Sequence, residues 1–146
     1  MMIKMVMIFR YKSIQRPDGN KIKTPSIPVV LSHKERFETM ALLDSGADFS
    51  AIPKGVAEIL GINLQGKKEQ TIGIGGRAET IKAKLSIGIM KGHEHYTFTL
   101  PTSVILGDYD FPVILGREGF FNEFVITFNQ AEEKVTMKKI DKKHFL

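Results

Sequence analysis

The chain has 146 residues, of which 42% are hydrophobic and 25% charged, as expected for one globular domain over 1–146 with an ordinary core. It contains no cysteine, which excludes disulfides, thiolate metal sites and a cysteine nucleophile and is compatible with the cytoplasmic location that we expect. No apolar run approaches the ~18 residues of a membrane helix, so we expect no membrane contact. The net charge of +5 is small and lies partly in a basic tail, 141–146, so we expect no nucleic-acid partner.

The first ten residues resemble a signal peptide only superficially. Lys4 and Arg10 bracket just five apolar residues, fewer than a secretory core contains, and no small-residue cleavage site follows them. We therefore interpret this segment as a β-strand. The role of the N-terminal region as a whole, 1–24, is left open.

Alternation of apolar and polar residues with period two dominates the rest of the chain and predicts three β-hairpins. The clearest strand is 80–89, in which every odd-numbered residue from Ile81 to Ile89 is apolar and falls on one face. The predicted hairpins pair 27–31 with 37–43, 80–89 with 96–100, and 124–128 with 135–139.

Two segments break this alternation and predict short helices. In 53–61, Pro53 suits a first helical turn, Val56, Ile59 and Leu60 share one face, and Gly61 is a suitable C-terminal stop. Residues 117–122 predict a shorter helical turn. The fold class predicted is therefore all-β, with a closed or partly closed barrel and one or two short helices.

The sharpest local motif is an apolar strand that runs directly into Asp44-Ser45-Gly46. A carboxylate at this point leaves the sheet at its end, where a barrel opens. Gly46 has no Cβ and permits a tight turn, and the Ser45 hydroxyl can lock the loop through a backbone hydrogen bond. The same residue types also form ordinary turns, and composition alone would place Asp-(Ser/Thr)-Gly in roughly one in ten chains of this length.

Two further motifs accompany the first one. Ile72-Gly73-Ile74-Gly75-Gly76 is a glycine-rich turn flanked by strands, and Ile114-Leu115-Gly116-Arg117 places Gly116 seventy-two residues after Asp44. In this order and spacing, the three motifs resemble those of the retropepsin-type aspartic proteases, the single-lobed relatives of pepsin. The resemblance covers residues 25–140 and implies a homodimeric acid-protease-type β-barrel.

The resemblance also implies roles for individual residues. Asp44 would be the catalytic aspartate, Ser45 would tie the two active-site loops together across a dimer, and Gly46 would contact the substrate backbone. Asp48 would bond substrate main chain and pair with Arg117, next to Gly116. The residues that would bind substrate are Ala47, Ile72, Gly73, Ile74, Gly75, Gly76 and Ile114, with the glycine-rich turn acting as a flap. The helix at 53–61 and the hairpin at 124–139 look more like the cellular members and the pepsin lobes.

The chemistry explains why one aspartate is not enough. Hydrolysis of a peptide bond by water needs a base for the water and an acid for the carbonyl oxygen, and two neighbouring carboxylates that share one proton supply both. Asp18-Gly19 and Asp108-Tyr109-Asp110 do not repeat the Asp-Ser-Gly motif. We therefore expect a homodimer that contributes one Asp44 per copy and binds an extended peptide as an added strand.

Three other chemistries find weaker support. The segment 73–78 fits a dinucleotide-binding fingerprint, which requires a following helix, whereas the next ten residues alternate with period two. His93 and His95 could ligate a metal, but no third ligand is evident. Ser45 and Ser50 do not lie in a nucleophile elbow. We expect neither a metal nor a cofactor.

The alternative from another class is a protein with this fold that binds or dimerises without cutting peptides. The presence of Asp44 argues against it, because a buried carboxylate pair without a function is costly. The substrate itself is not indicated by the sequence.

Overall fold

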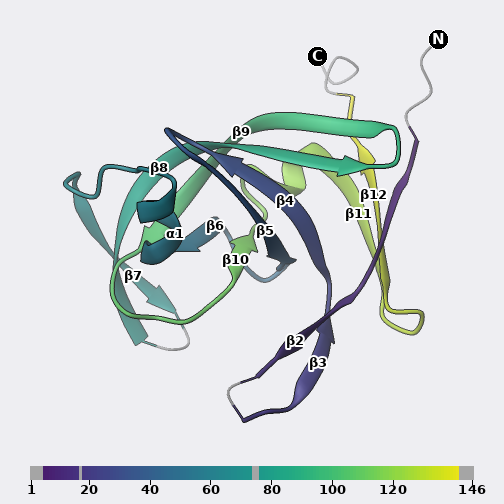
Figure 1. The fold of residues 1–146 in the computed structure, drawn as a ribbon, viewed down its shortest axis with the longest axis horizontal. Coiled ribbons are helices and arrows are strands. Elements are labelled where there is room, and N and C mark those ends of the chain that lie inside the picture. Colours follow the sequence, from purple (N-terminus) through teal and green to yellow (C-terminus); the bar gives the residue numbers. More distant parts are fainter. Residues whose placement is uncertain (1–4, 17, 74–75, 142–146) are drawn as a thin grey trace.

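The computed structural model describes residues 5–16, 18–73 and 76–141 and shows a mostly β protein with one short α-helix (Figure 1). In these ranges the strands form three sheets. The expected all-β fold is therefore confirmed.

The largest sheet has seven strands in the order β4-β5-β10-β6-β9-β8-β7. The first and sixth strands of this order also pair with each other, through Val30–Ser32 and Ser86–Gly88, so the sheet curves round into a ring (Figure 1). The strand bounds are β4 Ser26–Ser32, β5 Arg36–Leu43, β6 Ser50–Pro53, β7 Lys68–Gly73, β8 Gly76–Lys91, β9 Glu94–Ile105 and β10 Val113–Leu115.

A second sheet joins the two ends of the described chain. β12 (Lys134–Lys139) lies between β1 (Met7–Arg10) and β11 (Phe124–Asn129), and both pairings are antiparallel. One face of this sheet is buried in the hydrophobic core, through Met7, Phe9, Val135 and Met137. The interpretation of the first residues as a strand holds for Met7–Arg10.

All three predicted hairpins form, and the central one is longer than expected. β8 and β9 pair without interruption from Thr80↔Ile105 to Lys91↔Glu94. Ile81, Leu85, Ile87 and Ile89 are buried, as the period-two pattern predicts for one face of a half-buried strand.

The first predicted helix is present but shorter. α1 spans Lys54–Ile59, and Pro53 ends β6 as the extended N-cap residue. Gly61 has φ +74 and donates its N–H to Glu58 O, while Ile62 donates to Ala57 O. This pair of bonds is a Schellman motif, which satisfies the last carbonyls and requires the left-handed conformation that glycine adopts without strain.

The shorter helical turn predicted at 117–122 forms only in part, as the 3₁₀ turn η1 (Phe121–Glu123). Gly119 takes φ +88, outside the right-handed helical region, and donates its N–H to Asn122 Oδ1 over 2.8 Å. The chain therefore turns sharply before the short helical segment begins.

One hairpin was not predicted. β2 (Lys12–Gln15) and β3 (Lys21–Thr24) pair antiparallel and form a sheet of their own. The tripeptide Pro17-Asp18-Gly19 is a turn signal that could have indicated it. Across the described residues, no helix combines the length and apolar character needed to cross a membrane.

Candidate active site

The position of Asp44 follows from an unusual arrangement of three strands. β10 lies between β5 and β6, parallel to β5 with Leu115 opposite Leu43, and antiparallel to β6 with Ile114 opposite Ala51. β5 and β6 are the two strands that the loop 44–49 connects. The loop therefore runs from β5 to β6 past the C-terminal end of β10, which lies between these two strands.

Backbone hydrogen bonds hold Asp44 in this loop. Its N–H donates to Leu115 O over 3.0 Å, and Ala47 donates to Asp44 O over 3.1 Å. The Gly46 N–H donates to Asp44 Oδ1 over 3.0 Å, which orients the carboxylate. Asp44 is half-buried, while Ser45 and Gly46 are exposed, so the loop turns its reactive side toward solvent.

Gly116 is the point of closest packing in the site. Its N–H donates to Ser50 Oγ over 3.0 Å, and Ser50 is buried. A Cβ at Gly116 would lie 2.4 Å from both the carbonyl carbon and the carbonyl oxygen of Phe49. Because backbone atoms cannot yield as a flexible side chain can, this approach requires glycine.

Asp48 and Arg117 form the expected ion pair. The two loops are also joined by backbone bonds, from Arg117 N to Ala47 O over 2.9 Å and from Glu118 N to Asp48 O over 2.8 Å. The pair is open to solvent, because the side chains are 56% (Arg117) and 69% (Asp48) exposed. An ion pair so exposed to water stabilises the chain by itself only weakly.

The glycine-rich turn joins β7 and β8. Gly73 pairs with Gly76, and Ile72 is 74% exposed, whereas the predicted substrate-binding residues Ile74 and Gly75 lie outside the described residues. Ile114, the other apolar residue predicted to contact substrate, is half-buried on β10. The structure thus brings Asp44, Ser45, Gly46, Ala47, Asp48, Gly116 and Arg117 together on two bonded loops and places the glycine-rich turn on a separate hairpin.

The residues behind the weaker alternatives have other surroundings. The glycine-rich fingerprint leads into the strand β8, so the helix that a dinucleotide site needs is not there. His93 lies in a turn and His95 on β9, both exposed, and among the described residues no three His, Cys, Asp or Glu side chains cluster as metal ligands do. Ser50 accepts the Gly116 N–H and so supports the loop.

Sequence reasoning did not single out Phe49 and Lys82. Phe49 ends the Asp44 loop with a side chain that is 52% exposed. The Lys82 ammonium lies 4.6 Å from the centre of its ring, a cation–π distance, and donates to Ser103 Oγ over 3.2 Å. Lys82 comes from β8 and Ser103 from β9, so only the folded chain brings them next to Phe49.

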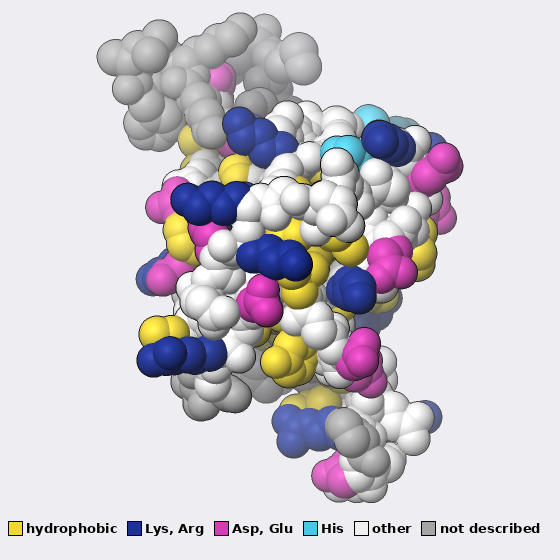
Figure 2. Space-filling model, turned by 90° about the vertical axis from the view of Figure 1, so that its left-hand side faces the viewer, with side chains coloured by type: hydrophobic (Ala, Val, Ile, Leu, Met, Phe, Trp, Pro, Cys, Tyr) yellow, Lys and Arg dark blue, Asp and Glu magenta, His cyan; other side chains and the backbone are white. Residues whose placement is uncertain are grey.

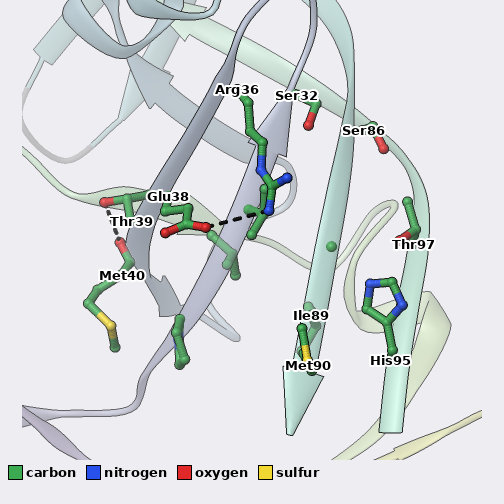
Figure 3. Close-up of a pocket in the computed structure, with 14 residues that line it drawn as sticks. Ser32, Arg36, Glu38, Thr39, Met40, Ser86, Ile89, Met90, His95 and Thr97 are labelled. Carbon is green, nitrogen blue, oxygen red and sulfur yellow. Dashed lines mark hydrogen bonds and ion pairs between the residues drawn. The ribbon is translucent and has the colours of Figure 1, made fainter.

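A separate groove of about 790 Å³ lies on the outer face of β4, β5, β8 and β9, away from Asp44 (Figure 3). Arg36 and Glu38 form an exposed ion pair on one side of it, and His95 lies on the other side. Since none of the predicted site residues lines this groove, it is not the predicted active site.

Comparison with known proteins places these features in a family. The family model described as aspartyl protease matches residues 29–118, which include Asp44, the glycine-rich turn and Gly116. A search of curated proteins found no match.

Seventy-one solved chains match the fold. A retropepsin-like aspartic protease from Rickettsia conorii has a TM-score of 0.55 at 19% identity, over 95% of this chain and 96% of its own. An EIAV protease in complex with an inhibitor has a TM-score of 0.44 at 28% identity, over 66% of this chain and 84% of its own. The first likeness supports the fold alone, and the second is too weak to support an argument.

Proposed function

The chain belongs to the aspartyl protease family, and we propose that it is an endopeptidase whose active site forms across a homodimer, with one Asp44 from each copy. The observation that carries the proposal is the single Asp-Ser-Gly loop, which is exposed at the end of the sheet with its carboxylate held by the Gly46 N–H. The chemistry needs a second carboxylate, and a second copy of the same exposed loop supplies it.

The two Asp44 carboxyls then share one proton and act on a water between them. The ionised carboxylate takes a proton from the water as its oxygen attacks the peptide carbonyl carbon. The protonated carboxyl gives its proton to the carbonyl oxygen, and a tetrahedral diol forms. When the carbon–nitrogen bond breaks, the carboxyl that took the water's proton gives it to the nitrogen, and the other carboxylate takes a proton from one diol hydroxyl. The products are a carboxylic acid and an amine, and the pair regains its single shared proton.

The remaining site residues bind and position the peptide. We assign to the β7–β8 hairpin the role of a flap that closes over an extended substrate and excludes water. Ile72, Ile114 and Ala47 contact substrate side chains, and Gly46 contacts its backbone. Ser45 ties the two catalytic loops together across the dimer, Asp48 bonds substrate main chain, and Arg117 holds Asp48.

The test is hydrolysis of a denatured protein or a peptide library by the wild type and by Asp44→Asn. Asparagine keeps the shape of the side chain but cannot take the proton, so we expect the rate to fall by roughly three orders of magnitude or more while the fold is retained. Glu58→Gln is the matched control, because it makes the same change of carboxylate to amide at an exposed position of α1, and it should cleave at the wild-type rate.

Two results would contradict this proposal. Cleavage by Asp44→Asn near the wild-type rate would refute the mechanism. A wild-type protein that dimerises and binds peptides but cuts none of them would instead be a binding module with this fold.

A further inference from the structure

The β2–β3 hairpin projects from the body of the molecule at its lower end (Figure 1) and forms a lobe of its own in the space-filling view (Figure 2). All four residues of β2 and three of the four residues of β3 are exposed. A two-stranded hairpin alone is only marginally stable in water. The exposed surface of this hairpin is therefore available for a stabilising contact with another molecule.

The base of the hairpin lies beside the catalytic loop. Pro25, which follows β3, accepts a hydrogen bond from the Leu43 N–H over 2.9 Å, and Ser26 pairs with Leu42. Asp44 is the next residue of the chain after Leu43. On the other strand, the buried Tyr11 anchors the hairpin. From this fixed base, four strand residues and a turn extend roughly 15–20 Å.

The two faces of the hairpin differ. Ile14 lies opposite Ile22, and Lys12 lies on the same face by alternation, as does Arg16 just beyond β2. The isoleucines are 37% (Ile14) and 36% (Ile22) exposed, so this face has an apolar centre between two basic residues.

The opposite face carries Ser13, Gln15, Lys21 and Lys23. Lys23 forms an ion pair with Glu133, in the turn between β11 and β12, over 3.6 Å. This face is therefore the one turned toward the body of its own chain, and the face with Ile14 and Ile22 is turned away from it.

The charge of the hairpin is opposite to that of the catalytic loops. Residues 12–24, which form the hairpin, contain four basic residues and one acidic residue, Asp18. The loops 44–49 and 116–118 contain three acidic residues and one basic residue, and they expose Asp48, Glu118 and the ring of Phe49. The hairpin thus offers basic and apolar groups, and the catalytic loops of a second copy offer acidic and apolar ones.

We propose that the β2–β3 hairpin is an arm that grips the second copy of this chain through Ile14, Ile22, Lys12 and Arg16. This proposal rests on the homodimer of the proposed function. In that dimer the two Asp44 carboxyls lie within hydrogen-bonding distance of a shared water, so the bases of both arms are close to the two-fold axis. An arm of this length that starts beside the axis has the partner's catalytic loops within reach.

The test is the dimer dissociation constant, measured by sedimentation equilibrium on the full chain, for two matched charge reversals. Arg16→Glu lies on the contact face and should raise the constant about tenfold or more. Lys21→Glu makes the same change of charge on the opposite face of the same arm and should change it less than about threefold.

The apolar centre has its own pair of variants. Ile14→Ser combined with Ile22→Ser removes the apolar contact and should weaken the dimer by about tenfold or more. Ser13→Ala combined with Gln15→Ala changes the other face and should leave it unchanged. Thermal unfolding of each variant verifies that the core, to which none of these side chains belongs, is intact.

Three results would overturn the proposed role of the arm. The first is a wild-type chain that stays monomeric at every concentration, and the second is an equal effect of Arg16→Glu and Lys21→Glu on the dimer dissociation constant. The third is an unchanged dissociation constant together with a raised KM for acidic peptides, which would show that the arm binds substrate instead. The proposed function is tested separately, by measuring peptide hydrolysis. A chain that dimerises through the arm but does not hydrolyse peptides would contradict the proposed protease activity and still support the role of the arm.

Discussion

The two glycines Gly116 and Gly55 show how strongly the effect of one substitution on stability depends on its surroundings. At Gly116, the backbone of Phe49 occupies the space of a Cβ, whereas at Gly55, within α1, a Cβ would have no atom from the rest of the fold, beyond its chain neighbours and its own helix backbone, within 4 Å. The same substitution should therefore have opposite effects at the two positions.

We predict that Gly116→Ala lowers the free energy of unfolding by about 2–3 kcal/mol, because the new methyl group forces backbone apart. Gly55→Ala should raise it by about 0.5–1 kcal/mol, since alanine favours the helix and restricts the unfolded chain. Urea unfolding of both variants checks the pair. Equal effects of the two changes would contradict the close approach at Gly116.

Tyr96 titrates unusually late. Its burial raises the pKa of the phenol to about 12, assisted by its hydrogen bond to Glu94 and by the negative charge of that carboxylate. Because the unfolded chain releases this proton near its ordinary pKa of about 10, it binds fewer protons than the folded chain between these values. The contribution of Tyr96 to stability is therefore complete below pH 10 and is lost as the pH rises toward 12.

We predict that Tyr96→Phe removes the phenol whose pKa is about 12 from the ultraviolet titration of tyrosinate. The variant should also lose less stability than the wild type between about pH 10 and pH 12. Tyr109→Phe is the control, because Tyr109 is 53% exposed. The assignment would be wrong if the late ionisation persisted in Tyr96→Phe.

At the scale of elements, the proposed catalytic centre depends on two loops that are bonded through their backbones. β10 is inserted between β5 and β6, and the carbonyl groups of Ala47 and Asp48 accept N–H donors from the loop that follows β10. The ion pair of Asp48 with Arg117 lies at the exposed edge of this junction, so the backbone bonds hold the loops and the two side chains face solvent.

We predict that Arg117→Ala lowers the free energy of unfolding by less than about 1 kcal/mol, as exposed ion pairs usually do. It should nevertheless raise the KM for peptides, because Asp48 then loses the group that holds it. Thermal unfolding and steady-state kinetics of one preparation separate the two effects. A large loss of stability with unchanged kinetics would show a structural role instead.

At the scale of the whole molecule, the described chain presents a half-buried aspartate on an exposed loop. In the proposed dimer this loop meets its copy, and the working state carries one proton between two carboxyls. Such a pair titrates as a unit rather than as two independent groups.

We predict a bell-shaped dependence of kcat/KM on pH, highest at mildly acid pH. At low pH both carboxyls are protonated and no base remains, and at high pH both are ionised and no acid remains. Initial rates across the pH range, in buffers of constant ionic strength, check this. A rate that rises steadily into alkaline solution would point to different chemistry.

Much of this protein can be predicted without its tertiary structure, because the decisive patterns are local. The alternation from Ile81 to Ile89 separates a buried face from an exposed one within a single strand, and each predicted hairpin needs only such faces and a turn. The Asp44 loop can be recognised for a similar reason, since its three residue types and its spacing to Gly116 are properties of the sequence itself.

The features that were missed depend on contacts between segments far apart in the sequence. Only packing brings Lys82 over Phe49, exposes the pair of Asp48 and Arg117, and places the backbone of Phe49 against Gly116. The β2–β3 hairpin escaped prediction because it has no buried face and hence no clear alternation, although Pro17-Asp18-Gly19 marks its turn. Periodicity reports which side of a strand is buried, whereas the register and neighbours of that strand are decided by the packing of the whole chain.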